Sequence, residues 1–331
     1  MNLKISSHTL QKLIMRLNSG VGHDSIHTVF LKHASLSFLE NIGHFLNSCF
    51  VHCYLPGDLL KGTITPILKD SRKKFTESDN YRPVMQSSCL LKIFELFILD
   101  VLSEKLVLNY RQLGYKAGVS TTDTCFILKE IMRKYTNSKK RALATFVDLS
   151  KAFDMVDHFI LGTKLLELSV PVDIILILMH YLRNQKANVK WQDSYSNYVY
   201  IATGVRQGGI ISPFLFKLYM DAILRDVARI EAGCKYGDMR CNILAYADDL
   251  VLLADSTQDM DKLYTRLCLS IDQHLLKINK EKTQCVIFAN NNNQQAESIE
   301  LNGDTLDVVR VFKYLGHQIM YNSKDPEDIT F

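Results

Sequence analysis

Apolar positions in the first 140 residues recur at helical rather than strand spacing. A densely apolar segment at 90–108 follows Ser87 and Ser88 and is long enough for a buried helix. A second helix is predicted over 126–134, with Asp123 as its N-cap. We therefore expect the N-terminal part of the chain to be mainly helical.

After residue 141, short apolar runs lie beside carboxylates. The run 143–147 stops at Asp148, which predicts a buried strand that ends at an acidic side chain. Farther along, two apolar runs are separated only by Asp248 and Asp249. Two such runs around a polar pair predict a tight hairpin.

Three further signals complete the pattern. Ser212-Pro213 is typical of a helix start, with Ser as the N-cap and Pro at the first helical position. Ser256 and Asp259 resemble a capping box, and Asn302-Gly303 indicates another hairpin. Helices mixed with hairpins predict an α+β fold with a largely antiparallel sheet. Since no Pro-rich or Gly/Ser linker is visible, we expect one interlocked unit.

Composition narrows the class of protein. The 331 residues are 47% hydrophobic and 22% charged, which is ordinary for a globular protein and excludes disordered, collagen-like and disulfide-scaffold classes. No apolar run approaches the roughly 18 residues of a membrane span, so no membrane partner is expected. Eight cysteines without a CxxC pair predict reduced thiols in an intracellular protein, nuclear or cytoplasmic.

The net charge of +4 is unevenly distributed. Between Lys61 and Arg141 there are 16 Lys and Arg against 8 Asp and Glu, and the remainder of the chain is mildly acidic. A basic section ahead of an acidic one suggests a polyanion-binding surface near an acidic site. A solvated helix face rich in lysine would give the same count.

The acidic site is predicted at Asp248 and Asp249. Asp is a favoured turn residue, so a plain hairpin is one interpretation. However, unit charges about 4 Å apart repel by about 4 kcal/mol at an effective dielectric near 20, and no basic residue lies within six positions. With Asp148 as a third carboxylate, the set would suit Mg²⁺, which prefers oxygen ligands.

At these residues the chain resembles the reverse transcriptases of non-LTR (LINE-type) retrotransposons. Five segments match that family's motifs in order: 146–154 (FVDLSKAFD), 204–208 (GVRQG) continuing to 212–216 (SPFLF), 246–249 (YADD), 276–283 (LKINKEKT) and 312–316 (FKYLG). Earlier segments resemble the family's finger motifs: 22–26 (GHDSI), 66–69 (PILK), 80–84 (NYRPV) and 112–115 (QLGY). The chain departs from the family pattern at Gly209 and at 22–25.

The resemblance implies a right-hand polymerase of fingers and palm, with an antiparallel palm sheet flanked by helices. Residues 1–140 would form basic, mainly helical fingers. Residues 141–322 would form the palm, with part of 159–203 returning to the fingers. Residues 323–331 would be the truncated entry to a missing thumb, and endonuclease and thumb segments would belong to the full element.

The resemblance also assigns metal ligands. Asp148 and Asp248 would bind two Mg²⁺ ions, for which Mn²⁺ can substitute, with Asp249 as a supporting ligand and the Leu149 carbonyl as a backbone ligand. Lys282 would protonate the leaving pyrophosphate; the alternative is a solvated lysine.

Other residues would hold the nucleotide and primer. Lys69 and Arg82 would bind the triphosphate, or are solvated cations. Phe153 would exclude a ribose 2′-hydroxyl, or packs in the core. Gln207 and Gly208 would approach the nucleotide, or form a tight loop.

The implied hairpin at Tyr314, Leu315 and Gly316 would position the primer end; a plain structural hairpin is the alternative. The implied activity is that of an RNA-directed DNA polymerase that uses an RNA template, a DNA primer and deoxynucleoside triphosphates. Two rivals remain: a catalytically silent transposon-derived fragment that folds and binds RNA, and an RNA-dependent RNA polymerase. Phe153 and the YADD segment favour DNA synthesis over RNA synthesis.

Overall fold

The computed structural model describes residues 4–69, 74–106, 111–116, 118–289 and 297–322. Contacts divide the chain into two compact units, each built from two stretches: Met1–Val107 with Phe153–Phe216, and Leu108–Ala152 with Lys217–Phe331. The expected single unit is therefore replaced by two, and no linker marks them because the chain crosses from one to the other three times. The residues 323–331 assigned to a thumb lie outside the described residues.

The units do not follow the predicted boundary near residue 140. The helix α5 (Thr121–Asn137) belongs to the second unit because it packs on that unit's strands. The stretch Phe153–Phe216 belongs to the first unit. The names fingers and palm remain predictions for these two units.

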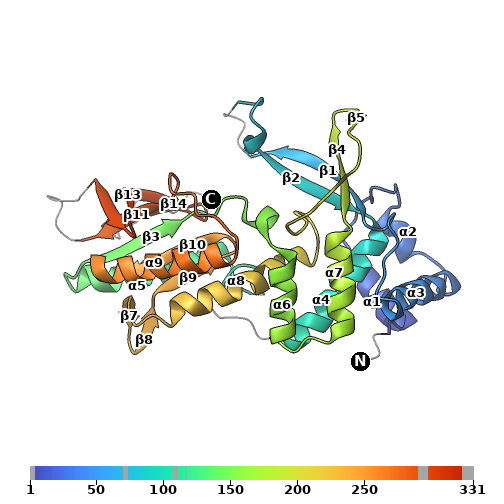
Figure 1. The fold of residues 1–331 in the computed structure, drawn as a ribbon, viewed down its shortest axis with the longest axis horizontal. Coiled ribbons are helices and arrows are strands. Elements are labelled where there is room, and N and C mark those ends of the chain that lie inside the picture. The colour runs from blue at the N-terminus through green and yellow to red at the C-terminus, as the bar shows by residue number, and fades with distance from the viewer. Residues whose placement is uncertain (1–3, 70–73, 107–110, 117, 290–296, 323–331) are drawn as a thin grey trace. The chain divides into compact units, whose positions relative to one another are not determined.

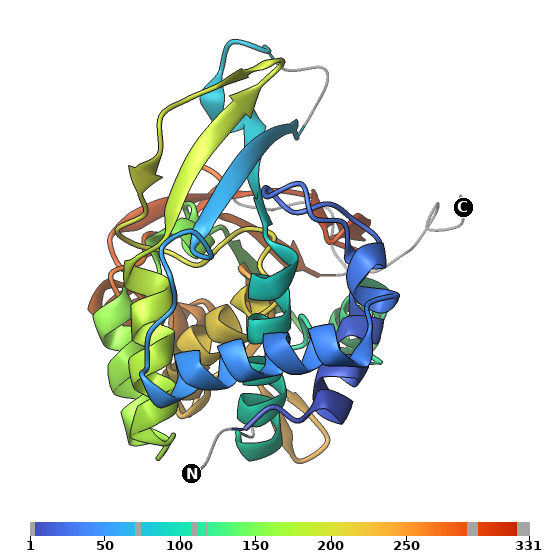
Figure 2. The same cartoon turned by 90° about the vertical axis from the view of Figure 1, so that its right-hand side faces the viewer.

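The first unit contains a group of helices, visible in Figure 2 beneath a projecting sheet. They are α1 (Ser7–Arg16), α2 (Thr28–Lys32), α3 (Leu36–Val51), α4 (Cys89–Lys105), α6 (His158–Glu167) and α7 (Val172–Arg183). The predicted helix after Ser87 and Ser88 is confirmed as α4, and the Ser88 hydroxyl caps it by accepting from the Leu91 N–H. This cap satisfies a backbone donor that the first helical turn leaves unpaired.

The sheet of the first unit has the order β2-β1-β4-β5, with β6 also pairing with β4 (Figure 1). Its strands are β1 (Lys61–Leu68), β2 (Tyr81–Ser87), β4 (Lys186–Trp191), β5 (Ser194–Tyr195) and β6 (Val199–Tyr200). A single 3₁₀ turn, η1 (Ser78–Asn80), precedes β2. Strands β1 and β2 pair antiparallel, whereas β1 and β4 pair parallel.

The second unit is built on a six-stranded sheet of order β12-β13-β11-β3-β10-β9. Its strands are β3 (Ala142–Val147), β9 (Ile243–Tyr246), β10 (Asp249–Ala254), β11 (Gln284–Phe288), β12 (Ser298–Leu301) and β13 (Asp304–Val308). All six residues of β3 are buried because α5 and α9 both contact this central strand. A strand covered on both faces is continuously apolar, which is the pattern that predicted it.

Helices and small hairpins complete the second unit. They are α8 (Ser212–Ala228), which begins in the first unit, α9 (Thr257–Gln273), η2 (Ala152–Met155) at the boundary, and the hairpins β7 (Cys234–Tyr236) with β8 (Met239–Cys241) and β14 (Val311–Tyr314) with β15 (His317–Met320). The α+β class is thus confirmed.

Two predicted helix caps are wrong. Ser120, not Asp123, caps α5; the Asp123 carboxylate instead accepts from the Ser120 N–H, which closes a reciprocal capping box. Helix α8 begins at the predicted place, but Ser212 is its first helical residue. The Ser212 hydroxyl is buried and finds no hydrogen-bond partner among the described residues.

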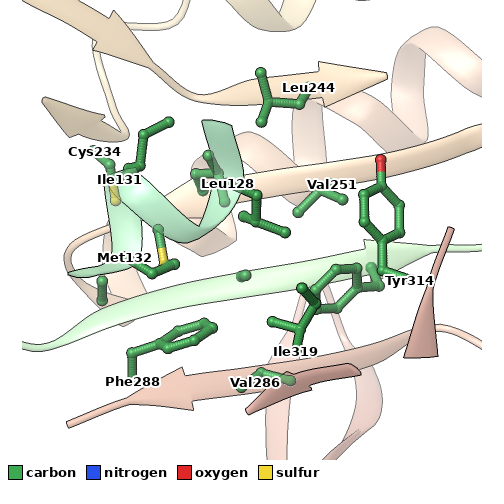
Figure 3. Packing of buried hydrophobic residues seen from close by; sticks show 14 of the residues in the cluster. Leu128, Ile131, Met132, Cys234, Leu244, Val251, Val286, Phe288, Tyr314 and Ile319 are labelled. Atoms are coloured by element: carbon green, nitrogen blue, oxygen red, sulfur yellow. The ribbon is translucent and has the colours of Figure 1, made fainter. Parts of the chain in front are cut away.

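A buried apolar cluster joins α5 to the second sheet, as Figure 3 shows. Leu128, Ile131 and Met132 of α5 face Val251 and Val286 of the sheet. Burying such side chains contributes about 1.5–3 kcal/mol each. The cluster thereby fixes β3 and β10, the strands that carry the predicted metal ligands.

The described residues contain no helix that is both long and apolar enough to cross a bilayer. All eight cysteines lie within the described residues, and none forms a disulfide.

Candidate active site

Two neighbouring strands of the second unit bring the predicted metal ligands together. Asp148 follows β3, and Asp249 opens β10 directly after Asp248. The antiparallel register pairs Val147 with Leu250, so its continuation places Asp148 opposite Asp249. Side chains opposite each other in such a pair are about 5 Å apart at Cβ. The hairpin prediction at the acidic pair is confirmed by the pairing of β9 with β10.

A buried glutamine holds the acidic turn from a distant part of the chain. Gln112 is 1% exposed, and its amide donates to the Ala247 carbonyl at 3.1 Å. Its Oε1 accepts from the Ala247 N–H at 3.0 Å and from the Gly114 N–H at 3.1 Å. Ala247 adopts a left-handed backbone with φ of 57°, a conformation that few non-glycine residues take. The glutamine therefore stabilises a strained turn between Tyr246 and Asp248.

The neighbouring Gly114 also matters for this turn. A Cβ at this glycine would lie 2.3 Å from the Ala247 nitrogen, so a side chain there would displace the turn. Residues 112–115 resemble a finger motif, but Leu108–Ala152 belongs to the unit that holds Asp148. The role of Gln112 was missed because its partner lies 135 residues away.

The backbone at Asp148 is held by the predicted fourth motif. The Asn279 N–H donates to the Asp148 carbonyl at 2.8 Å, and the Ser150 N–H donates to the Lys277 carbonyl at 2.8 Å. Thr283 is 1% exposed; its hydroxyl donates to the Asn279 carbonyl and accepts from the Asp148 N–H. Leu149 is buried between these contacts and forms a bridge with Ile278. This segment therefore fixes the direction in which Asp148 leaves β3.

The three carboxylates form a local concentration of negative charge. Burial, followed by the charges of Asp248 and Asp148, raises the pKa of Asp249 to about 6, although its side chain reaches solvent. Lys282 Nζ lies 3.8 Å from Asp148 Oδ2, and the lysine side chain is 69% exposed. An exposed pair at this distance contributes little stability. Lys282 itself therefore offsets little of the repulsion between the carboxylates.

The predicted primer hairpin lies beside these carboxylates. A cavity of about 410 Å³ is lined by residues of both, including Asp148, Asp249, Lys282, Lys313 and Tyr314. The Tyr314 hydroxyl is 3.5 Å from the Asp249 carbonyl oxygen, and burial raises the pKa of Tyr314 well above its ordinary value. Its ring also packs on Phe146 of β3.

The turn of that hairpin is formed by Leu315 and Gly316, with φ of 49° and 90°. Two successive positive φ values match the tight turns that antiparallel strands favour.

The donor set fits a divalent cation. Three carboxylates lie at the neighbouring ends of β3 and β10, and their mutual repulsion would be relieved by a cation there. In the described part of the chain, no three Asp, Glu, His or Cys side chains are already gathered at ligand spacing. The fit therefore rests on backbone position, charge and ligand chemistry.

The first unit holds the residues assigned to the nucleotide. The Met85 N–H of β2 donates to the Gln207 carbonyl at 2.7 Å, and the Gln207 amide donates to Asp154 Oδ1 at 2.8 Å. Gly208 has φ of 106°, and a Cβ there would lie 2.8 Å from the Met85 carbonyl oxygen. Only glycine allows this close approach without strain.

Phe153 lies in the same unit and stacks on Phe216 of α8, with ring centroids 4.4 Å apart. Its carbonyl accepts from the Val205 N–H, which ties it to the segment before Gln207. The ring is partly buried, so packing and a contact with substrate are both compatible with its position.

Lys69 and Arg82 lie near the end of the β1–β2 ladder at which Leu68 pairs with Tyr81. Arg82 is exposed opposite Ile67, and Lys69 Nζ donates to the Asp79 carbonyl at 2.8 Å. The two cations are therefore close neighbours on one hairpin.

A buried polar network, which the sequence pattern does not indicate, supports the Gln207 loop. Arg206 is 3% exposed and donates to Gln185 Oε1, Ser87 Oγ and the Leu60 carbonyl. Fully buried Glu95 accepts from the Tyr181 hydroxyl at 2.7 Å and from the Ile210 N–H at 2.6 Å. Buried charges with this many hydrogen bonds fix backbone positions on both sides of Gln207.

Comparison with known proteins places these residues in one family. A family model described as reverse transcriptase (RNA-dependent DNA polymerase) matches residues 67–319. The chain is 27% identical over 314 residues to a probable RNA-directed DNA polymerase from transposon BS of Drosophila melanogaster, covering 91% of this chain and 34% of that protein.

Two further relatives are similar. Identity is 25% over 332 residues with the RNA-directed DNA polymerase from mobile element jockey of Drosophila melanogaster, covering 96% of this chain and 35% of the relative. It is 25% over 255 residues with a retrovirus-related Pol polyprotein from the type-1 retrotransposable element R2 of Nasonia vitripennis, covering 74% and 25%. The chain thus spans between a quarter and about a third of the length of these relatives. With a family model extending over three quarters of its length, the chain belongs to the reverse transcriptase (RNA-dependent DNA polymerase) family.

Proposed function

We propose that this chain is an RNA-directed DNA polymerase core that extends a DNA primer with deoxynucleotides on an RNA template. The observation that carries the proposal is the meeting of Asp148 and Asp249 across β3 and β10, beside the adjacent Asp248. Reverse transcriptases use divalent metal ions. Asp148, Asp248 and Asp249, with the Leu149 carbonyl, would hold them here.

When bound, two Mg²⁺ ions, or Mn²⁺ in their place, would activate the primer 3′-hydroxyl and neutralise charge on the leaving pyrophosphate. The protein's own contribution is to orient the ligands before any ion arrives. Gln112 fixes the turn that carries Asp248, and Thr283 fixes the strand end that carries Asp148. Lys282, whose Nζ lies 3.8 Å from Asp148 Oδ2, would donate a proton to the leaving group.

The same proposal gives roles to the first unit. Gln207 and Gly208 would lie against the nucleotide, with Phe153 under its sugar and Lys69 and Arg82 on its phosphates. The β14–β15 turn at Tyr314, Leu315 and Gly316 would hold the primer end, since Tyr314 lines the same cavity as Asp249. An RNA template, a DNA primer and deoxynucleoside triphosphates are thus the proposed partners.

Primer extension by the purified chain tests the proposal. The RNA template carries an annealed DNA primer, with Mg²⁺ or Mn²⁺ and either deoxynucleotides or ribonucleotides. We expect extension with deoxynucleotides, and its loss in Asp148→Ala and Asp248→Ala variants that remain folded. Asp238→Ala, at an exposed turn between β7 and β8, is the matched control. If either active-site variant retains a tenth of the parent rate, the ligand assignment is wrong. If the parent chain itself shows no extension, the result favours a catalytically silent fragment.

A further inference from the structure

We propose that one face of the first unit's sheet is a binding surface for single-stranded nucleic acid, made of residues other than those assigned above to the polymerase site. We call it the lysine–tyrosine face. It consists of six residues of β1, β4, β5, β6 and the loop before β6: Lys61, Lys186, Lys190, Tyr195, Tyr198 and Tyr200.

Strand register places five of these side chains on the same side of the sheet, and Tyr198, which precedes β6, joins them through the contact of its ring with Lys61. Lys61 pairs with Lys186, Lys186 with Tyr200, and Lys190 with Tyr195. Directly opposed residues point to one face, and residues two or four apart on a strand share that face. The side chains of Trp191 and Val199 fall on the opposite face by the same rule.

Each tyrosine ring of this face has a lysine above it. The Nζ–centroid distances are 5.5 Å for Lys61 and Tyr198, 4.4 Å for Lys186 and Tyr200, and 5.7 Å for Lys190 and Tyr195. The tyrosines are nevertheless 43–66% exposed. A lysine covers only one side of a ring, so much of each ring stays open to solvent.

Rings and ammonium groups arranged in this way match the chemistry of a single strand. Aromatic rings stack on unpaired bases with little regard for sequence, and lysines neutralise the phosphates between them. In a duplex the bases are already stacked on each other, so this face favours a strand without a partner. Four residues of β4 span about 13 Å, enough to present rings to more than one base.

The charge of the face is suited to such an anion. Asp58 Oδ1 pairs with Lys61 Nζ at 2.5 Å, so Lys61 is already neutralised. In the described part of the chain, no carboxylate forms an ion pair with Lys186 or Lys190. These two lysines therefore supply the net positive charge for binding phosphates.

Equilibrium binding of fluorescein-labelled strands to the full chain tests the inference. The probes are an oligouridylate and an oligodeoxythymidylate of about 15 nucleotides, and an abasic strand of equal length. The buffer contains EDTA and no nucleotide, so the result is independent of catalysis by Asp148 and Asp248. Failure of primer extension and failure of this binding are therefore separate outcomes.

The ring-deleted variant combines Tyr195→Ser, Tyr198→Ser and Tyr200→Ser. We expect its affinity for both base-bearing strands to fall by about tenfold or more, with little change for the abasic strand. The matched control removes three exposed rings elsewhere in the unit, by Phe30→Ser, Phe38→Ser and Phe159→Ser, and should bind normally. Trp191, the single tryptophan, lies on the opposite face, where its ring centroid is 5.4 Å from that of Tyr81. Tryptophan fluorescence emission that is the same in the ring-deleted variant and the parent shows that the sheet is intact.

The charge variant Lys186→Gln with Lys190→Gln should weaken binding of all three strands and flatten the salt dependence by about 1.4 in slope. Ring-dependent binding of either strand supports the face; unequal affinities identify the preferred strand, and equal affinities show that the face does not distinguish RNA from DNA. Unchanged affinity in the ring-deleted variant, or equal losses for base-bearing and abasic strands, would overturn the inference. A smaller sedimentation mass of that variant would overturn it too, because the face would then join copies of the chain.

Discussion

Asp249 is partly desolvated and lies beside two other carboxylates, and this sets the pH dependence expected of its titration. Its pKa is raised to about 6 in the folded chain, from 3.8. A proton is therefore bound more tightly by the folded than by the unfolded state. The free energy of unfolding should fall as the pH rises from about 4 to about 6, and should remain lower above that range.

The variant Asp249→Asn removes this penalty. In EDTA, we expect it to be more stable than the parent above pH 6 and to lose the fall in stability between pH 4 and pH 6. Urea unfolding at a series of pH values measures both effects. Asp193→Asn, at an exposed turn of the first unit, is the control. A parallel loss of stability in Asp249→Asn and parent across this range would contradict the assignment.

The two interpretations of Phe153, core packing and exclusion of a ribose 2′-hydroxyl, can be separated by substitution. Phe153→Val should lose about 1–3 kcal/mol of stability because its stack on Phe216 is lost. If the ring also excludes a 2′-hydroxyl, use of ribonucleotides should rise relative to deoxynucleotides. Phe216→Leu disrupts the same stack and serves as control. Equal discrimination ratios in the two variants would assign Phe153 to packing alone.

Among helices and strands, the local pattern of apolar and polar residues predicted those elements that depend mainly on contacts between sequence neighbours. The hairpin around Asp248 follows from two short apolar runs and a polar pair, and β3 follows from a run that is buried on both faces. The cap of α5 was misplaced because Ser120 and Asp123 bond to each other, and spacing alone does not show which is the cap.

Contacts between distant segments could not be predicted in this way. Gln112 meets Ala247, and Glu95 meets Ile210, across more than a hundred residues. The periodicity of apolar residues along the chain does not indicate that a particular glutamine or glutamate is buried and supports a loop. The division into two units was missed for the same reason, since each unit joins segments that are far apart along the chain.

The clamp on the acidic turn gives a prediction for one element. Gln112→Met keeps the volume but leaves the Ala247 N–H and carbonyl without this partner, which costs about 1–3 kcal/mol for each buried group. We expect slower primer extension and a higher Mg²⁺ concentration for half-maximal rate, because Asp248 is no longer held. Gln318→Met, exposed on β15, should change neither. A normal Mg²⁺ requirement with only reduced stability would make Gln112 purely structural.

The arginine before Gln207 supports a second element. Arg206→Met should lower the free energy of unfolding by about 3 kcal/mol, because three buried acceptors lose a charged donor. Arg16→Met, which removes an ion pair with Asp100 whose two side chains are 46% and 38% exposed, should lose less than about 1 kcal/mol. Urea unfolding measures both, and similar losses in the two variants would remove the special role of Arg206.

The basic section of the chain does not belong to a single unit. The basic section between Lys61 and Arg141 is divided between the units at Val107, so each unit carries part of it. If about five phosphates are neutralised, log affinity for an RNA–DNA hybrid should fall against log salt with a slope near −4. Fluorescence anisotropy at several salt concentrations measures that slope.

The source of the charge can then be located. Lys139→Gln with Lys140→Gln removes two exposed lysines from the basic section, and Lys12→Gln with Lys235→Gln removes two exposed lysines outside it. Each lost phosphate contact reduces the slope by about 0.7–0.9, so the first pair should flatten it by roughly 1.5 while the second leaves it unchanged. Equal effects would show that only the total charge matters. If the slope of log affinity against log salt for the parent chain is near zero, the basic section does not contribute to nucleic-acid binding. Base stacking would then be the main source of the affinity.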